Sequence, residues 1–197
     1  MTNVLSVTSE CVPLVKTGGL ADVAGALPKA LAPLGHDMRT LLPGYRAVKA
    51  ALKGPKPVAT FEQFFGGTAR ILDAQYAGLH LYVLDAPHLY DREGSPYLDA
   101  AGQDFADNPE RFAALSWMAA ELALTGAGGW MPDVLHCHDW QAGFAPYYLS
   151  KGGGGVPTVF TIHNVAFQGN APAERIEALG LDRADFTEAG FEFWGQA

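Results

Sequence analysis

A strand-like run, a glycine pair and a helical pattern follow one another directly between residues 3 and 34. Asn3 to Ser9 is rich in apolar residues. Apolar residues then recur from Leu20 to Leu34 at the three-and-four spacing of one helix face. The pair Gly18–Gly19 therefore lies where a strand turns into a helix. Such a unit is typical of folds in which strands and helices alternate.

The loop in this unit is suited to bind an anion. The first N–H groups of a helix lack intrahelical partners, and the helix dipole adds to their attraction for negative charge. Gly18 and Gly19 allow backbone angles that a Cβ would forbid, and they let a ligand approach the main chain. Lys16 adds a mobile positive charge. These residues predict a phosphate-binding loop. Taken alone, the glycine pair favours a simpler interpretation, a tight turn beside a solvated lysine.

The loop does not match two common phosphate motifs. It lacks the pattern G-x-G-x-x-G, and its lysine precedes the glycines instead of following them as in G-x-x-x-x-G-K-[ST]. A dinucleotide cofactor and a P-loop NTPase are therefore disfavoured.

The rest of the chain alternates between strand and helix patterns. Strands are predicted at 37–42, 134–138 and 157–162, and helices at 108–125 and 141–151. Three glycine-linked strands at 58–65, 68–76 and 79–85 predict an antiparallel edge. We therefore predict one α/β domain over residues 1–197, with a doubly wound, mostly parallel sheet and an antiparallel hairpin or meander insertion.

Three local features carry predictions of their own. Pro28 lies inside the first helix pattern and is expected to kink it. Asn108 is expected to cap the helix that follows, with Pro109 at its first position. The irregular segment 86–103 is either a functional loop or a surface excursion pinned by its tyrosines.

Composition excludes several classes of protein. The formal net charge is −8 and no basic run occurs, which disfavours nucleic acid and anionic membrane surfaces as partners. Two cysteines make no disulfide framework, so a reduced, cytoplasmic setting is expected. No signal peptide is recognised, and no apolar run approaches the roughly 20 residues that span a bilayer.

Polar segments are predicted at the carboxyl ends of three strands, where open α/β sheets bind ligands. They are the Lys16 loop, residues 138–143 and residues 161–169. Each contains titratable residues where a structural turn would need only a cap. Asp139 could be the N-cap of the following helix, could face a ligand, or could do both.

Metal and nucleophile chemistry are disfavoured. His136 and His138 could share one face of a strand, but no C-x-x-C pair or H-E-x-x-H helix completes a zinc site. A packed, hydrogen-bonded strand is the favoured interpretation, and no metal is predicted. No serine or cysteine lies in a G-x-S-x-G elbow, which disfavours a nucleophilic triad.

Five short motifs occur in order between about Val4 and Gln196. They are KTGGLADV (16–23), DAPHLY (85–90), GSPY (94–97), HDWQAG (138–143) and TIHN (161–164). Together they resemble the bacterial glycogen synthase and plant starch synthase family. One such motif would be modest evidence, whereas five in register are strong evidence.

The resemblance implies a GT-B glycosyltransferase, in which two Rossmann-like domains face each other across a cleft. Family members transfer glucose from ADP-glucose to the non-reducing 4-hydroxyl of an α-1,4-glucan. They retain the anomeric configuration and use no metal or other cofactor, and the donor phosphate helps to deprotonate the acceptor. The implied partners are ADP-glucose, the glucan and the C-terminal domain of the same protein.

The resemblance also implies site residues by matching position. Lys16 and the main chain of Gly18 and Gly19 would contact the donor phosphate and glucose. Tyr97 would lie on the acceptor side. The sugar pocket would be lined by four further residues, of which the last two are the implied catalytic pair: Glu10, Asp22, Asp139 and His163.

Family members continue into a C-terminal domain that grips the donor diphosphate, and no such region follows Trp194. The chain is therefore expected to be the N-terminal, acceptor-side half and to be inactive by itself. Two alternatives stay open. One is a non-catalytic carbohydrate- or nucleotide-binding module, and the other is a GT-B transferase that uses another donor, such as UDP-glucose, or another acceptor.

Overall fold

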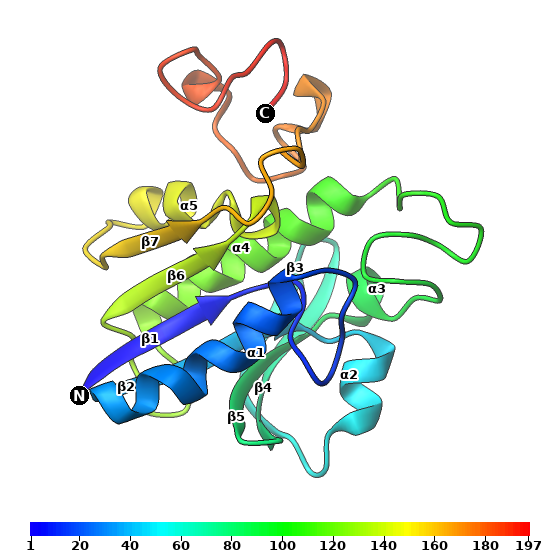
Figure 1. Ribbon diagram of the computed structural model, residues 1–197. Helices are drawn as coiled ribbons and strands as arrows, with labels where there is room; N and C mark the ends of the chain where they lie inside the picture. Colours follow the sequence, from blue (N-terminus) through cyan, green and yellow to red (C-terminus); the bar gives the residue numbers. More distant parts are fainter.

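Seven strands form one sheet in the order β3-β4-β5-β2-β1-β6-β7 in the computed structural model, which describes residues 1–197 (Figure 1). The strands are β1 (Thr2–Val7), β2 (His36–Pro43), β3 (Lys56–Phe64), β4 (Gly67–Tyr76), β5 (Leu79–Asp85), β6 (Val134–His138) and β7 (Thr158–Thr161). The α-helices are α1 (Leu20–Leu31), α2 (Arg46–Ala51), α3 (Pro87–Tyr90), α4 (Asn108–Thr125) and α5 (Ala145–Lys151). Four 3-10 helices are also present, η1 (Ala32–Leu34), η2 (Trp140–Ala142), η3 (Ala173–Arg175) and η4 (Arg183–Asp185).

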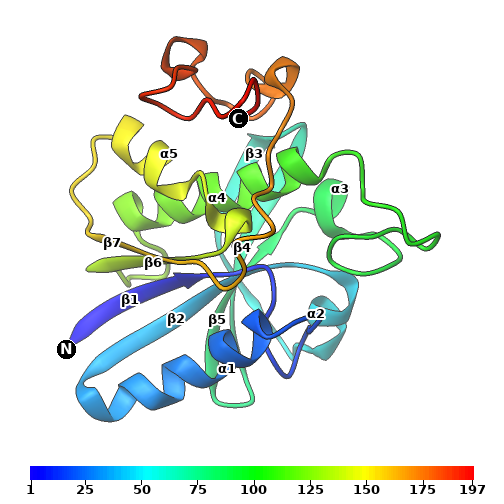
Figure 2. The same ribbon diagram turned by 45° about the horizontal axis from the view of Figure 1, so that its top comes forward.

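The sheet from β5 to β7 is parallel. β1 pairs with β2 and β6, β2 pairs with β5, and β6 pairs with β7. α1 covers one face, while α4 and α5 lie together on the other (Figure 2). The predicted doubly wound sheet is confirmed. The chain leaves β1 towards one face and β6 towards the other, so the carboxyl ends of these neighbouring strands form the switch point where such sheets bind ligands.

The antiparallel insertion is confirmed at one edge of the sheet. β3 pairs with β4 and β4 pairs with β5, and β5 joins this meander to the parallel strands through β2. The two turns contain Phe65–Gly66 and Ala77–Gly78, and all four residues have positive φ. Such turns match the right-handed twist of the strands they connect.

The buried face of α1 differs from the apolar pattern. Val23 is 41% exposed, and Leu34 lies beyond the helix and is 70% exposed. The buried residues of α1 are Leu20 and Ala21 at its start, and Ala24 and Pro28 further along. α1 continues past Pro28 to Leu31, and the kink expected there stays a prediction.

Close packing explains this choice of face. A Cβ on Gly25 would lie 2.6 Å from the carbonyl oxygen of Val12, which belongs to the segment that follows β1. The small residues let α1 approach this segment, whose Val12 N–H donates to the carbonyl of Ala21. The larger Val23 is turned outwards as a result.

Residues 141–151 do not form the single helix predicted. η2 ends at Ala142 and α5 begins only at Ala145. Pro146 has no N–H to donate to the carbonyl of Ala142, so a continuous helix would lose a bond there. The break keeps the residues next to Asp139 in a turn at the carboxyl end of β6.

The C-terminal segment from 162 to 197 packs beside α4 and α5 (Figures 1 and 2). Arg175 pairs with Glu110 at the start of α4, and Tyr147 of α5 donates to Asp185 at 2.8 Å. Four apolar residues of the C-terminal segment belong to the core cluster: Ala171, Ile176, Leu179 and Leu181. None of the helices combines the length and the apolar character needed to cross a bilayer.

Candidate functional site

Glu10 lies at the centre of a hydrogen-bonded cluster that follows β1. Its side chain is buried, and the Thr17 and Gly18 N–H groups both donate to it, the latter at 3.2 Å. The Thr17 hydroxyl donates at 2.6 Å and the Tyr97 hydroxyl at 2.5 Å. Four donors are enough to stabilise a buried carboxylate. The Gly18 N–H, which was predicted to bind an anion of the substrate, is therefore already bonded to a carboxylate of the protein.

Lys16 forms an ion pair with Asp22. Its ammonium donates to both carboxylate oxygens of Asp22, at 2.6 and 2.8 Å. The side chains are 52% and 56% exposed, so this ion pair contributes little to stability. It places the positive charge over the first turn of α1, where no side chain caps the free N–H groups. The loop thus has a cation and free helix N–H groups that could bind an anion. The cation, Lys16, is already paired with the Asp22 carboxylate.

Gly18 and Gly19 do not adopt backbone angles reserved for glycine. Neither has a positive φ, and Gly19 has φ −71° and ψ −22°. A Cβ on either residue would meet no atom within 4 Å. That part of the sequence prediction is wrong. The pair contributes main chain without side chains at the N-terminal end of α1.

A matched pair of substitutions tests this conclusion. Gly18→Ala is expected to change the free energy of unfolding by less than about 0.5 kcal/mol, because its Cβ points into open space. Gly25→Ala is expected to lower it by about 1–3 kcal/mol, since its Cβ would overlap Val12, although alanine's helix propensity offsets part of the loss. Urea denaturation of both variants measures the difference. Equal destabilisation by the two would show that Gly18 is needed for conformation.

Tyr97 belongs to the irregular segment 86–103, and it is held on both sides. Its hydroxyl contacts Glu10 and the hydroxyl of Ser9, the latter at 2.8 Å. Its carbonyl accepts from the side-chain amide of Asn108 at 2.9 Å. Burial and the nearby Glu10 carboxylate raise the pKa of the Tyr97 hydroxyl, so it stays a donor. The segment is pinned by its tyrosines, and that pinning brings Tyr97 to the site.

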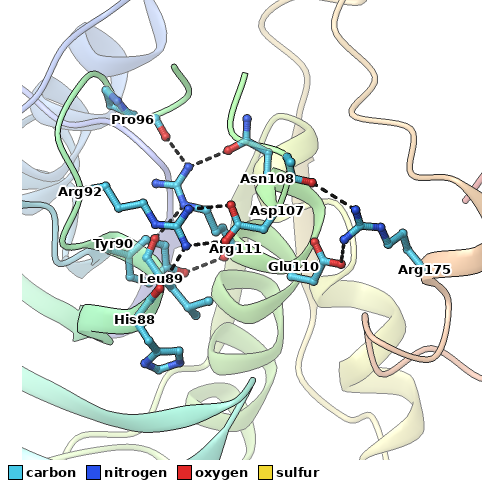
Figure 3. Close-up of polar contacts among 11 residues, drawn as sticks. His88, Leu89, Tyr90, Arg92, Pro96, Asp107, Asn108, Glu110, Arg111 and Arg175 are labelled. Atoms are coloured by element: carbon cyan, nitrogen blue, oxygen red, sulfur yellow. Dashed lines mark hydrogen bonds and ion pairs between the residues drawn. The ribbon is translucent and has the colours of Figure 1, made fainter. Parts of the chain in front are cut away.

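Asn108 does not cap α4 as predicted. α4 has no side-chain cap, and the Asn108 side chain instead joins Tyr97 to Arg111. Arg111 is 1% exposed, and its guanidinium donates to the carbonyls of Leu89 and Pro96 and to Asn108 Oδ1 (Figure 3). These bonds tie the 86–103 segment to the start of α4.

Asp139 occupies the N-cap position of η2, but its side chain does not cap the helix. No side-chain cap is made on η2, and Asp139 Oδ1 accepts instead from the N–H of His163 at 2.6 Å. Its backbone has φ 55° and ψ −175°, a conformation that residues other than glycine rarely adopt. Its own N–H donates to the carbonyl of Thr161 at 2.9 Å. The strained backbone aims the carboxylate across at the loop that follows β7.

The ring of His163 contacts His138. His163 Nε2 lies 3.0 Å from His138 Nδ1, and His138 Nε2 lies 3.2 Å from the hydroxyl of Ser6 on β1. Burial, together with the neighbouring His136 and His163, lowers the pKa of His138 to about 3, so the ring is neutral at pH 7. His136 uses its own Nε2 in a contact of 2.8 Å with Thr161. No group of three histidine, cysteine or acidic side chains is arranged to hold a metal ion.

The predicted residues thus fall into three groups at the carboxyl ends of β1, β6 and β7. Glu10 and Tyr97 contact the glycine loop, Lys16 pairs with Asp22, and Asp139 pairs with His163. Six participants were not predicted as site residues: Ser6, Ser9, Thr17, Asn108, Arg111 and His138. The position of Arg111, four residues before Leu115 and seven before Met118 on the apolar face of the predicted helix, was the signal available.

A groove of about 440 Å³ opens beside this site but contains none of the predicted residues. It lies between the start of α4, Trp140, the β7 loop and the C-terminal segment. Eleven of its 16 lining residues are hydrophobic, which does not suit a sugar diphosphate. The polar clusters at the strand ends are therefore the candidate site.

Comparisons with known proteins identify the family of this chain. The family described as "Starch synthase catalytic domain" matches residues 3–197. Glycogen synthases of Jannaschia sp. (strain CCS1) and Paracoccus denitrificans (strain Pd 1222) are both 56% identical, over the whole of this chain and 41% and 42% of their own lengths. The chain thus spans about two-fifths of these relatives.

A solved structure gives the same result. The catalytic domain of Starch Synthase IV from Arabidopsis thaliana, bound to ADP and acarbose, matches with a TM-score of 0.76 and 31% sequence identity. The match covers 92% of this chain and 38% of that one. With a family match over nearly its whole length, the chain belongs to the starch synthase catalytic domain family.

Proposed function

We propose that the family-length protein transfers glucose from ADP-glucose to the non-reducing 4-hydroxyl of an α-1,4-glucan, with retention of configuration. The observation that carries the proposal is the family match over residues 3–197. The names of the bacterial relatives support a glucan product. The ADP and acarbose in the plant structure support the donor and acceptor classes.

In this proposal the Lys16 loop binds the donor phosphates. As the bond from the sugar carbon to the diphosphate breaks, negative charge grows on the leaving oxygen. The Lys16 ammonium and the Gly19 N–H stabilise that charge, and the Gly18 N–H joins them when it is released from Glu10. A phosphate competes with the Asp22 carboxylate for Lys16, because both anions suit the same cation. Asp22 then serves as a sugar-pocket residue.

Asp139 and His163 act at the sugar in this proposal. Departure of the diphosphate leaves a cation-like sugar carbon, which needs fixed groups of suitable polarity around it. The Asp139 carboxylate holds the N–H of His163 at 2.6 Å and so fixes the main chain beside that carbon. The acceptor hydroxyl gives its proton to the departing phosphate oxygen, so no side chain has to act as the base. Glu10 lines the sugar pocket, and Tyr97 lies on the acceptor side.

We infer that the 197 residues form one wall of a two-domain cleft. The chain spans about two-fifths of the relatives it matches, which is consistent with one Rossmann-like domain out of two. A second domain supplies further contacts to the donor diphosphate. The chain by itself is then expected to transfer no glucose.

Incorporation of labelled glucose into glycogen tests both statements. The family-length protein is expected to incorporate label from ADP-glucose, and the 197-residue chain is expected to remain at background. Transfer by the short chain at the rate of the long one would disprove the half-site inference. Titration calorimetry of both proteins measures the binding of ADP-glucose and of a maltooligosaccharide separately from transfer. A family-length protein that binds both without transfer would be a binding module, and preferential use of UDP-glucose would overturn the donor assignment.

A further inference from the structure

His138 links the first strand of the sheet to His163. It projects from β6 between Ser6 of β1 and His163 after β7, and both Ser6 and His138 are completely buried. The rings of His138 and His163 are 5.3 Å apart and inclined by only 25°. Three residues far apart in the sequence thus form one chain of hydrogen bonds, from Ser6 Oγ through both nitrogens of His138 to His163 Nε2.

Each bond in this chain needs one proton, and there are two ways to supply them. A neutral imidazole has one nitrogen that donates and one that accepts. In the first arrangement, the Ser6 hydroxyl donates to His138 Nε2 and His138 Nδ1–H donates to His163 Nε2. In the second, both bonds are reversed, so that His163 donates to His138 and His138 donates to Ser6.

The first arrangement is favoured because of the Ser6 hydroxyl. Its only hydrogen-bond partner in the protein is His138 Nε2, and its side chain is completely buried. In the second arrangement its proton would have no acceptor. A buried donor without an acceptor shifts such an equilibrium by roughly tenfold or more. Burial, which lowers the pKa of His138, also keeps its ring from carrying protons on both nitrogens at neutral pH.

We propose that Ser6 and His138 are positioning residues that fix His163 as the Nδ1–H tautomer. With Nε2 occupied as an acceptor, the neutral His163 ring has one free donor, Nδ1–H. His163 is partly exposed at the switch point, so this donor is available to a sugar hydroxyl of the bound substrate. The functional part of the inference rests on the proposed glucosyl transfer, whereas the tautomer itself does not.

Imidazole ¹H–¹⁵N correlation spectra of the 197-residue chain test the tautomer without any activity. The expected spectrum shows His163 protonated at Nδ1 and His138 protonated at Nδ1. Ser6→Ala removes the donor to His138 Nε2 and is expected to shift His163 towards the Nε2–H form. A His163 ring protonated at Nε2 in the wild-type chain, or one unaffected by Ser6→Ala, would overturn the proposal.

Three variants separate positioning from folding. His138→Asn keeps an N–H donor near the position of Nδ1 and is expected to preserve the His163 tautomer, whereas His138→Leu is expected to lose it. Thr161→Val removes the partner of the adjacent His136 and is the control, with no expected change at His163. If the leucine and asparagine variants give the same His163 spectrum, His138 does not set the tautomer.

The family-length protein provides the functional readout. Ser6→Ala is expected to lower kcat for glucosyl transfer by roughly tenfold while KM for the donor changes little, because a ring tautomer and not the phosphate site is altered. An unchanged kcat with the expected spectral change would refute the functional part alone. If wild-type protein transfers no glucose, the proposed function fails, and the spectra still decide the tautomer.

Discussion

Replacing Arg111 by methionine is expected to lower the free energy of unfolding of the 197-residue chain by about 3–5 kcal/mol. The substitution removes three hydrogen bonds that end on Leu89 O, Pro96 O and Asn108 Oδ1. These oxygens lie around a side chain that is 1% exposed, so they would lose a partner that water cannot easily replace. Methionine fills a similar volume, so the expected loss is due to polar groups and not to a cavity.

The reason for such a large effect is the position of Arg111 between a helix and a loop. Its bonds fasten the 86–103 segment to α4 (Figure 3). Asn108 extends the network to Tyr97. Burial lowers the pKa of Arg111, but hydrogen bonds and the face of the Phe105 ring, 4.6 Å away, stabilise the cation. Loss of the arginine is expected to release Tyr97 from Glu10 as well.

Urea denaturation measures the stability change, and Arg175→Met is the matched control. Arg175 forms an ion pair of 2.5 Å with Glu110 on the same helix, but its side chain is 42% exposed. Its removal is expected to change the free energy of unfolding by no more than about 1 kcal/mol. Similar losses for the two variants would mean that burial of the Arg111 network has no special effect.

Replacing Lys16 by alanine in the family-length protein is expected to lower kcat/KM for ADP-glucose by about 10²–10³-fold. The proposed role of Lys16 is to stabilise charge on the departing diphosphate, and that charge is greatest in the transition state. The fold is expected to remain intact, because the pair with Asp22 is more than half exposed.

Lys29→Ala is the control for this experiment. Lys29 lies in the last turn of the same helix and is also exposed, but it is remote from the glycine loop. Its replacement is expected to leave donor kinetics unchanged. Steady-state kinetics with varied ADP-glucose, alongside urea denaturation, separates a catalytic loss from a folding defect. Unchanged donor kinetics in Lys16→Ala would return Lys16 to the role of a surface residue.

Much of the fold could be predicted because its signals are local. Alternating patterns predicted β6 at its observed bounds, and glycine turns predicted the β3–β4–β5 meander. Local signals failed where packing decided. The buried face of α1 follows the close approach to Val12 at Gly25. The break in the helix after Asp139 did have a local signal, the missing N–H of Pro146, which the prediction did not use.

For the site, the sequence by itself determined which residues gather at the carboxyl ends of β1, β6 and β7, since a parallel sheet brings those ends to one edge. It could not determine their partners. Only the tertiary structure paired Glu10 with the glycine loop, Lys16 with Asp22, and Asp139 with the main chain of His163. The physical reason is that a buried donor or acceptor takes the nearest partner in space, and these partners come from separate loops whose geometry the folded sheet sets.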